Sequence, residues 1–163
     1  MIDYLEKVAI ISDCTKYRYM LRRSWDFTKP RYLIVMLNPS TADAEKDDAT
    51  IRSCTRLCSA LGAGSYEVVN LFAYRATNPK ELFDLNHDAI GPKNDEHIEA
   101  ALFRCDLPIL AWGAHHLAYH RGNTIKSMIK RKRPAAFCFG TNKDKSPKHP
   151  LYIKSDASLQ IYA

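Results

Sequence analysis

The sequence contains no apolar run long enough to cross a membrane, which takes about 20 residues. The longest apolar runs cover only residues 33–37 and 107–112. Residues 1–7 do not form a basic segment followed by an apolar one, so no secretory signal is predicted. We therefore expect neither a membrane protein nor a membrane partner, and the cytoplasm is the expected compartment.

Cysteines are few, and their number is odd. The five are Cys14, Cys54, Cys58, Cys105 and Cys138. Without a secretory signal, an odd number favours reduced thiols over a disulfide framework. No second pair at zinc-finger spacing accompanies Cys54 and Cys58. Most of these cysteines are expected to pack as small apolar side chains.

The glycine motifs of common cofactor sites are also missing. The sequence has neither a Gly-x-x-x-x-Gly-Lys loop for phosphates nor a Gly-x-Gly-x-x-Gly turn for dinucleotides. It has no Gly-x-Ser-x-Gly turn for a hydrolase serine. His116 and His120 are spaced to share one face of a helix, but the glutamate of a His-Glu-x-x-His zinc site is absent. We expect no cofactor and no metal there.

The chain has 163 residues, which suits one domain with a core of its own. We expect a single domain over residues 1–163, with residues 1–30 forming an N-terminal hairpin extension of the sheet and residues 31–152 the core. Apolar residues make up 46% and charged residues 26%, which excludes a disordered chain. The net charge of +6 permits a polyanionic partner without requiring one.

Hydrophobic patterning predicts alternating strands and helices. Alternation over residues 17–22 predicts a strand with one solvent-exposed face, paired with residues 8–11 around a turn at residues 13–16. Further strands are expected over residues 32–37, from 67 to about 70, over 107–113 and over 135–140. Helices are expected from Asp47 or Asp48 to Leu61, and over residues 79–85, 94–104 and 114–132. The order predicts an α/β fold with three layers, whose central, mostly parallel four-stranded sheet carries the N-terminal hairpin.

Polar side chains gather after each core strand of the predicted sheet. In open α/β sheets, ligands bind beyond the carboxyl ends of the strands. The residues that this rule places in a candidate crevice are Asn38, Pro39, Ser40, Asp43, Asp48, Asn70, Phe72, Arg75, Trp112, Lys148 and His149.

Several of these residues also have a purely structural interpretation. Asn70 suits a buried amide that ties two loops together, and Trp112 suits the core. Arg75 suits an ion pair with Asp43 or Asp48 across the crevice. Both interpretations remain open at the level of the sequence.

Six segments of the chain resemble one family. They are residues 36–43, 47–52, 69–79, 91–94, 111–113 and 149–152. Together they are similar to the domain of unknown function 1643 family of bacteria and phages, over most of the chain from Tyr17 to Tyr152. The name of this family implies no activity.

A remoter resemblance links four short motifs to the uracil-DNA glycosylase superfamily. The motifs contain Asn38-Pro39, Asn70, Trp112 and His149, and they follow the order found in those enzymes. The resemblance implies their fold and a substrate that is a base, nucleoside, nucleotide or nucleic acid.

The same resemblance implies roles for individual residues. Asn38 is expected to position the attacking water, and His149 to stabilise negative charge on the departing base, which makes these two the candidate catalytic residues. Asn70 is expected to read a base edge, because an amide offers a donor beside an acceptor. Phe72 suits stacking on a base, and Arg75 suits a phosphate, as do the lysines of residues 143–148.

Three hypotheses follow. The first is a glycosylase-like enzyme, which requires Asn38 and His149 to converge on one pocket. The second is a non-catalytic module that binds nucleic acid or a nucleotide, with these two residues far apart or buried. The third is a metal-dependent small-molecule enzyme, which requires the carboxylates of Asp43, Asp47 and Asp48 to converge.

Overall fold

The structure is a computed structural model that describes residues 1–83 and 88–163. Its strands are β1 (Glu6–Ile11), β2 (Arg18–Ser24), β3 (Arg31–Met36), β4 (Ser65–Asn70), β5 (Leu107–Leu110), β6 (Phe137–Cys138) and β7 (Gln160–Ile161). Its helices are α1 (Ala49–Ala60), α2 (Asn94–Arg104) and α3 (Ala118–Lys132), with short 3₁₀ segments η1 (Pro79–Phe83) and η2 (Pro150–Tyr152).

Within the described residues, the strands form one mixed sheet in the order β1-β2-β4-β3-β5-β6-β7. Strands β4, β3, β5 and β6 run parallel, whereas β1, β2 and β7 pair antiparallel with their neighbours. The N-terminal hairpin extends the sheet as predicted, because β2 pairs with β4. The expected four-stranded sheet is corrected to a seven-stranded one, since the hairpin and β7 continue the same hydrogen-bonded array.

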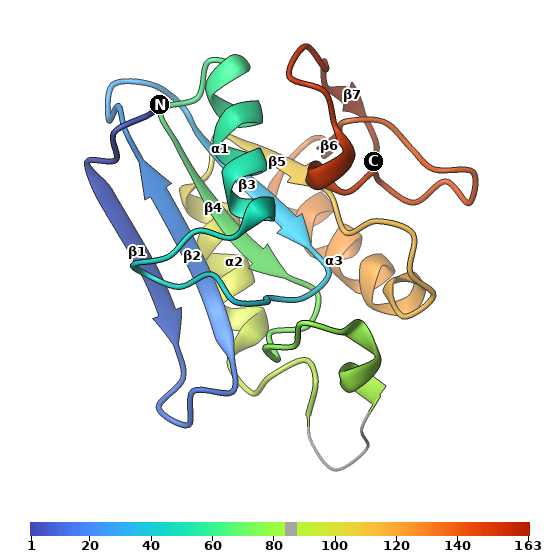
Figure 1. The fold of residues 1–163 in the computed structure, drawn as a ribbon. Coiled ribbons are helices and arrows are strands. Elements are labelled where there is room, and N and C mark those ends of the chain that lie inside the picture. Colours follow the sequence, from blue (N-terminus) through green and yellow to red (C-terminus); the bar gives the residue numbers. More distant parts are fainter. Residues whose placement is uncertain (84–87) are drawn as a thin grey trace.

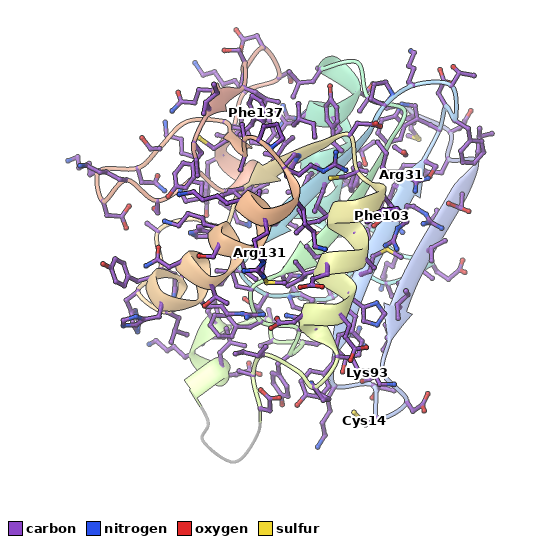
Figure 2. All side chains as sticks on the ribbon, turned by 180° about the vertical axis from the view of Figure 1, so that it is seen from behind. Cys14, Arg31, Lys93, Phe103, Arg131 and Phe137 are labelled. Carbon is purple, nitrogen blue, oxygen red and sulfur yellow. The ribbon has the colours of Figure 1, made fainter. Side chains whose placement is uncertain are left out.

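Helices cover both faces of this sheet (Figure 1). Helix α1 packs Ile51 and Cys54 against Ile34 of β3, whereas α2 and α3 lie on the opposite face. Figure 2 shows α2 and α3 in front of the sheet when the molecule is seen from behind. Because both faces are buried, β5 and β3 from Tyr32 onward are continuously apolar rather than alternating, whereas β4 also contains the buried polar residues Ser65, Glu67 and Asn70. No helix in the described part of the chain is long and apolar enough to cross a membrane.

Strand β2 differs from its prediction in a way that matters for the site. The expected solvent-exposed face is absent, because β2 lies between β1 and β4 and both of its faces are covered. A β-bulge interrupts its pairing: Arg18 lies opposite Ile11 and Met20 opposite Ile10, so Tyr19 is the extra residue. A bulge shifts the alternation by one residue. Arg18 consequently points to the α1 face, and Tyr19 stacks on His97 of α2.

Most other boundaries follow the sequence, with a few corrections. Asp48 is the N-cap of α1, and α2 has the predicted bounds. Helix α3 begins at Ala118 rather than at residue 114, so His116 precedes it and shares no helix face with His120. Strand β6 is shorter than predicted, and the tail adds η2 and β7. The short helix expected over residues 79–85 is the 3₁₀ segment η1, and its predicted last residues lie outside the described ones.

The turn into β4 depends on Gly64, because the structure leaves no room for a side chain at this position. A Cβ on Gly64 would lie 1.8 Å from the Asp26 carbonyl oxygen, whereas a Cβ on Gly62 would meet nothing within 4 Å. We expect Gly64→Ala to lower the free energy of unfolding by about 3 kcal/mol or more, the upper end of the usual cost of overpacking, because the atom it meets belongs to the backbone. Gly62→Ala should cost only about 1–2 kcal/mol, because its φ of +86° disfavours a side chain. Urea unfolding of both variants tests this order, and equal losses would contradict it.

Candidate functional site

A cavity of about 270 Å³ opens at the carboxyl ends of β3 and β5. The chain leaves β3 for β4 on one side and later returns to β5 on the other. Such a switch point is where open α/β sheets bind ligands, in pockets of about 300–1,000 Å³, so this cavity suits one small ligand. It is lined by Arg18, Met36, Leu37, Asn38, Ser40, Asp48, Thr50, Ile51, Ala76, Thr77, Pro79, Trp112 and His149.

Asn38 lies two residues beyond the end of β3, and its amide orientation is set by two carbonyl groups. Its Nδ2 donates to the carbonyl oxygens of Pro39 at 3.0 Å and Ala76 at 2.8 Å. Both bonds require the nitrogen at this position, so Oδ1 is the atom left to accept a hydrogen bond in the pocket. The arrangement suits holding a water or a hydroxyl group.

His149 reaches the same pocket from the loop before η2. Its Nδ1 accepts the backbone N–H of Leu151 at 3.2 Å. In the neutral ring the proton is therefore on Nε2, which is the nitrogen left to donate to a ligand. Burial lowers the pKa of His149, and the Asp48 carboxylate opposes this only in part. The ring is thus a neutral hydrogen-bond donor near pH 7.

Asp48 places a carboxylate at the N-terminus of α1. One oxygen, Oδ1, accepts the backbone N–H of Ile51 at 2.9 Å, as an N-cap does. A carboxylate has a second oxygen with further acceptor capacity, which can serve a ligand or a water. Asp48 is also close enough to raise the pKa values of Arg18 and His149 electrostatically.

Arg18 contributes a guanidinium group that is 2% exposed. Its Nη1 donates to the carbonyl oxygen of Ala42 at 2.9 Å, and Nε has no partner among the described residues. Burial lowers its pKa to about 10, so the group remains charged near neutrality. The pocket therefore contains a buried cation that was not expected from the sequence.

Trp112 and Ser40 complete the predicted residues that line the pocket. Trp112 also belongs to the core cluster beneath α3, so its structural and its binding interpretations hold together. Gly122 of α3 lies under the ring, where a Cβ would be 3.0 Å from Trp112 Cζ2. The absence of a side chain at this position lets the indole approach the helix.

Three other predicted binding residues are buried outside the pocket lining. Pro39 is buried, and its carbonyl oxygen accepts from Asn38. Phe72 packs in the core cluster of the α2 face, which leaves it no free ring face for a base. Asn70 is 0% exposed, and neither of its side-chain polar atoms has a partner among the described residues. By alternation with Val68, Asn70 points to the α1 face beside Met36, its partner on β3.

The remaining predicted binding residues lie nearer the surface and are not part of the pocket lining. Asp43 accepts the backbone N–H groups of Glu45 and Lys46, each at 2.8 Å, which makes it a turn residue. Arg75 donates to the carbonyl oxygen of Thr15 and forms no ion pair among the described residues, so the expected pair with Asp43 or Asp48 is not found. Lys148 is exposed.

The three carboxylates of the metal hypothesis each accept hydrogen bonds from a different part of the protein. Asp43 closes a turn and Asp48 caps α1, whereas Asp47 accepts from Arg23 and from the Tyr4 hydroxyl at 2.9 Å. Among the described residues, no three His, Cys, Asp or Glu side chains are placed to hold a metal ion. The convergence that this hypothesis requires is therefore not present.

A family model described as a protein of unknown function (DUF1643) matches residues 18–151, which is most of the chain. The chain belongs to this family. The first resemblance seen in the sequence is thereby confirmed. No curated protein and no solved structure matches the chain.

Among the pocket residues of this DUF1643 protein that were not predicted, Thr50 and Arg18 were missed for different reasons. Thr50 follows the predicted N-cap Asp48 by two residues, so the capping signal itself places it in the first turn of α1. Arg18 carried no such signal, because strict alternation groups it with Met20 and Arg22. Only the bulge at Tyr19 turns its side chain to the pocket.

The lowered pKa of His149 predicts a pH dependence of stability in this family member. Below about pH 6.5 the unfolded chain binds a proton at this ring that the folded protein does not, so stability falls as pH decreases through this range. We expect His149→Asn to weaken this dependence, because asparagine can still accept the Leu151 N–H but does not titrate.

Urea unfolding of both proteins between pH 7.5 and 5 measures this difference. His97 and His115, whose pKa values are also lowered, remain in both and cancel. An unchanged pH dependence in the variant would contradict the prediction.

Proposed function

We propose that this chain is an enzyme that cleaves or transfers the N-glycosidic bond of a nucleoside or nucleotide. The observation that carries the proposal is the meeting of Asn38 and His149 in one cavity, although they lie far apart in the sequence. The binding-module hypothesis required these residues to be separate or buried. Their convergence at the switch point of the sheet favours a reactive site.

The chemistry follows from the atoms that each side chain leaves available. In hydrolysis, a water held by Asn38 Oδ1 and Asp48 attacks the anomeric carbon of the sugar. The carbon–oxygen bond forms as the carbon–nitrogen bond breaks, and the electron pair of the broken bond moves to the base. The water proton passes to Asp48 and then to solvent, while Nε2–H of His149 donates to the departing base, which takes a proton from solvent. In transfer, an acceptor hydroxyl replaces the water.

Neutral His149 fits this role because a preorganised donor stabilises developing negative charge most effectively in a site that excludes water. The sugar develops positive charge at the same time, as in other glycosidic cleavages, and the Asp48 carboxylate offsets it. Asp48 therefore serves both as base and as counter-charge. Trp112 supplies an apolar wall to the same pocket.

The short motifs shared with uracil-DNA glycosylases support the proposal, since three of the four place residues in the pocket. The helices on both faces of the sheet are compatible with the layered fold of those enzymes, and we include that fold in the proposal. Asn70 departs from the pattern, because it is fully buried and does not line the pocket. A base in this site is therefore expected to be read by other groups.

A ligand panel followed by a product assay tests the proposal. Thermal unfolding is measured with free bases, nucleosides, nucleotides, single- and double-stranded DNA, and RNA. A ligand at 100 times its dissociation constant stabilises by about 2.7 kcal/mol, which is readily detected. Stabilising compounds are then incubated with the protein, and released base is quantified by chromatography.

Asn38→Ala and His149→Asn are compared with His120→Asn, an exposed histidine outside the pocket. Stabilisation by a nucleoside or nucleotide, with base release lost in the first two variants and kept in the third, supports the enzyme. Stabilisation by DNA alone that salt abolishes and all three variants retain would instead support a plain nucleic-acid binding module.

A further inference from the structure

Arg18 differs from the other buried arginines in the described part of the chain. Arg23 is 0% exposed and pairs with Asp47, with Nη2 2.8 Å from Oδ1, and Arg121 pairs with Asp95. Arg18 has no ion-pair partner in these residues, and its Nε is unpartnered. A buried charge is ordinarily paired, because leaving it uncompensated is costly. An unpaired guanidinium in a pocket wall therefore points to an anionic ligand.

The groups around Arg18 extend the same chemistry. Thr50 belongs to the first turn of the 12-residue helix α1, in which Asp48 caps the Ile51 N–H and the N–H groups of Ala49 and Thr50 have no partner within the helix. The positive end of the helix dipole favours an anion at this position. The hydroxyl groups of Ser40, Thr50 and Thr77 line the pocket as further donors. These donors and the guanidinium come from different segments and meet in one cavity.

We infer that Arg18 and the first turn of α1 bind a phosphate group, and that the substrate is a nucleotide with a terminal phosphate rather than a neutral nucleoside. The inference rests on the proposed function for the nucleoside part of the ligand. A guanidinium matches two phosphate oxygens with a pair of parallel N–H donors. Arg18 recognises the phosphate, and His149 and Asp48 act at the glycosidic bond.

The Asp48 carboxylate limits where the phosphate binds. It repels an anion, so we expect the phosphate to contact the Arg18 guanidinium and the Thr50 hydroxyl, with the sugar placed next to the Asp48 carboxylate. The burial of Arg18 also indicates whether the phosphate belongs to a small nucleotide or to a nucleic-acid backbone. A side chain that is 2% exposed contacts a group that enters the cavity, and not the backbone of a duplex lying on the surface. The ligand is therefore a small nucleotide.

The test compares ligands that differ only in the phosphate. Binding of nucleosides, of their 5′-monophosphates, of ribose 5-phosphate and of inorganic phosphate to the whole protein is measured by calorimetry. We expect each monophosphate to bind about 10- to 100-fold more tightly than its nucleoside, the range for hydrogen bonds to charged groups. We expect Arg18→Met to abolish this preference and Arg18→Lys to keep part of it.

Arg75→Met is the matched control, because Arg75 is a cation close to the pocket but outside its lining. It should change the preference by at most about fivefold, as for a surface charge.

Equal binding of nucleoside and monophosphate by the unmodified protein overturns the inference without any variant, and so does binding of neither. A phosphate preference without base release retains the inference and rejects the proposed function. If both ligands bind with equal affinity and both release base, the inference is rejected and the proposed function is retained.

Discussion

The Asp48→Asn variant is expected to release base about 10²- to 10⁴-fold more slowly than the unmodified protein, the usual contribution of a general base. The amide neither accepts the water proton nor offsets the charge on the sugar. Asparagine is as good an N-cap as aspartate, so the bond to the Ile51 N–H and the stability of α1 are retained. The rate of base release is measured with the substrate found in the ligand panel, beside the urea unfolding midpoint.

Asp43→Asn provides the matched control for this change. Asp43 also accepts backbone N–H groups, but it lies outside the pocket lining. Its substitution by asparagine keeps the turn and should leave the rate unchanged. If the two variants lose activity equally, Asp48 is not the base, and the loss reflects only the charge removed from this region.

Opposite effects on stability are expected for the two buried arginines of β2. Arg23→Met should lower the free energy of unfolding by about 3–5 kcal/mol, as when one partner of a buried pair is removed. Arg23 donates to Asp47 and to the carbonyl oxygens of Asp43 and Arg22, all of which would lose a partner. Arg18→Met should leave the stability of the ligand-free protein unchanged or raise it, because it removes a buried charge that has no ion-pair partner among the described residues and loses only one hydrogen bond, to the Ala42 carbonyl oxygen.

Urea unfolding of the two ligand-free variants tests this contrast. Both changes replace a buried arginine by the same side chain on the same strand, so general effects of the substitution cancel. A large loss of stability in Arg18→Met would show that the guanidinium supports the fold. Arg18 would then be a structural residue, and its place in the pocket would need another explanation.

Much of the architecture was predictable from local patterns. The apolar stretches at residues 32–37 and 107–113 predicted strands buried on both faces, and the strands found there, β3 and the shorter β5, lie at the centre of the sheet. Asp48 predicted the start of α1 through its capping chemistry. Four cysteines are buried as expected, and burial raises the pKa of three of these thiols, Cys54, Cys58 and Cys105.

The part of the site that could be predicted was the part next to strand ends. Asn38, Ser40 and Trp112 follow β3 and β5, so the rule for open sheets places them correctly once the strands are known. Asn70 is the last residue of β4 and Phe72 follows that strand, so the same rule selects both. The strand order alone does not exclude them, because Arg18 of the next strand, β2, lines the pocket; the side chains of Asn70 and Phe72 are instead buried in the core.

The sequence by itself determined the alternation of strands and helices, the capping of α1 and the family, because these depend on residues close together in the chain or on its motifs. Only the tertiary structure decided the strand order, the meeting of Asn38 with His149 and the burial of Arg18. The pairing of distant strands sets the switch point, and the bulge at Tyr19 arises where β2 is matched to β1. Both are properties of the whole sheet, since the sequence of one strand does not by itself determine its hydrogen-bond register with a neighbouring strand.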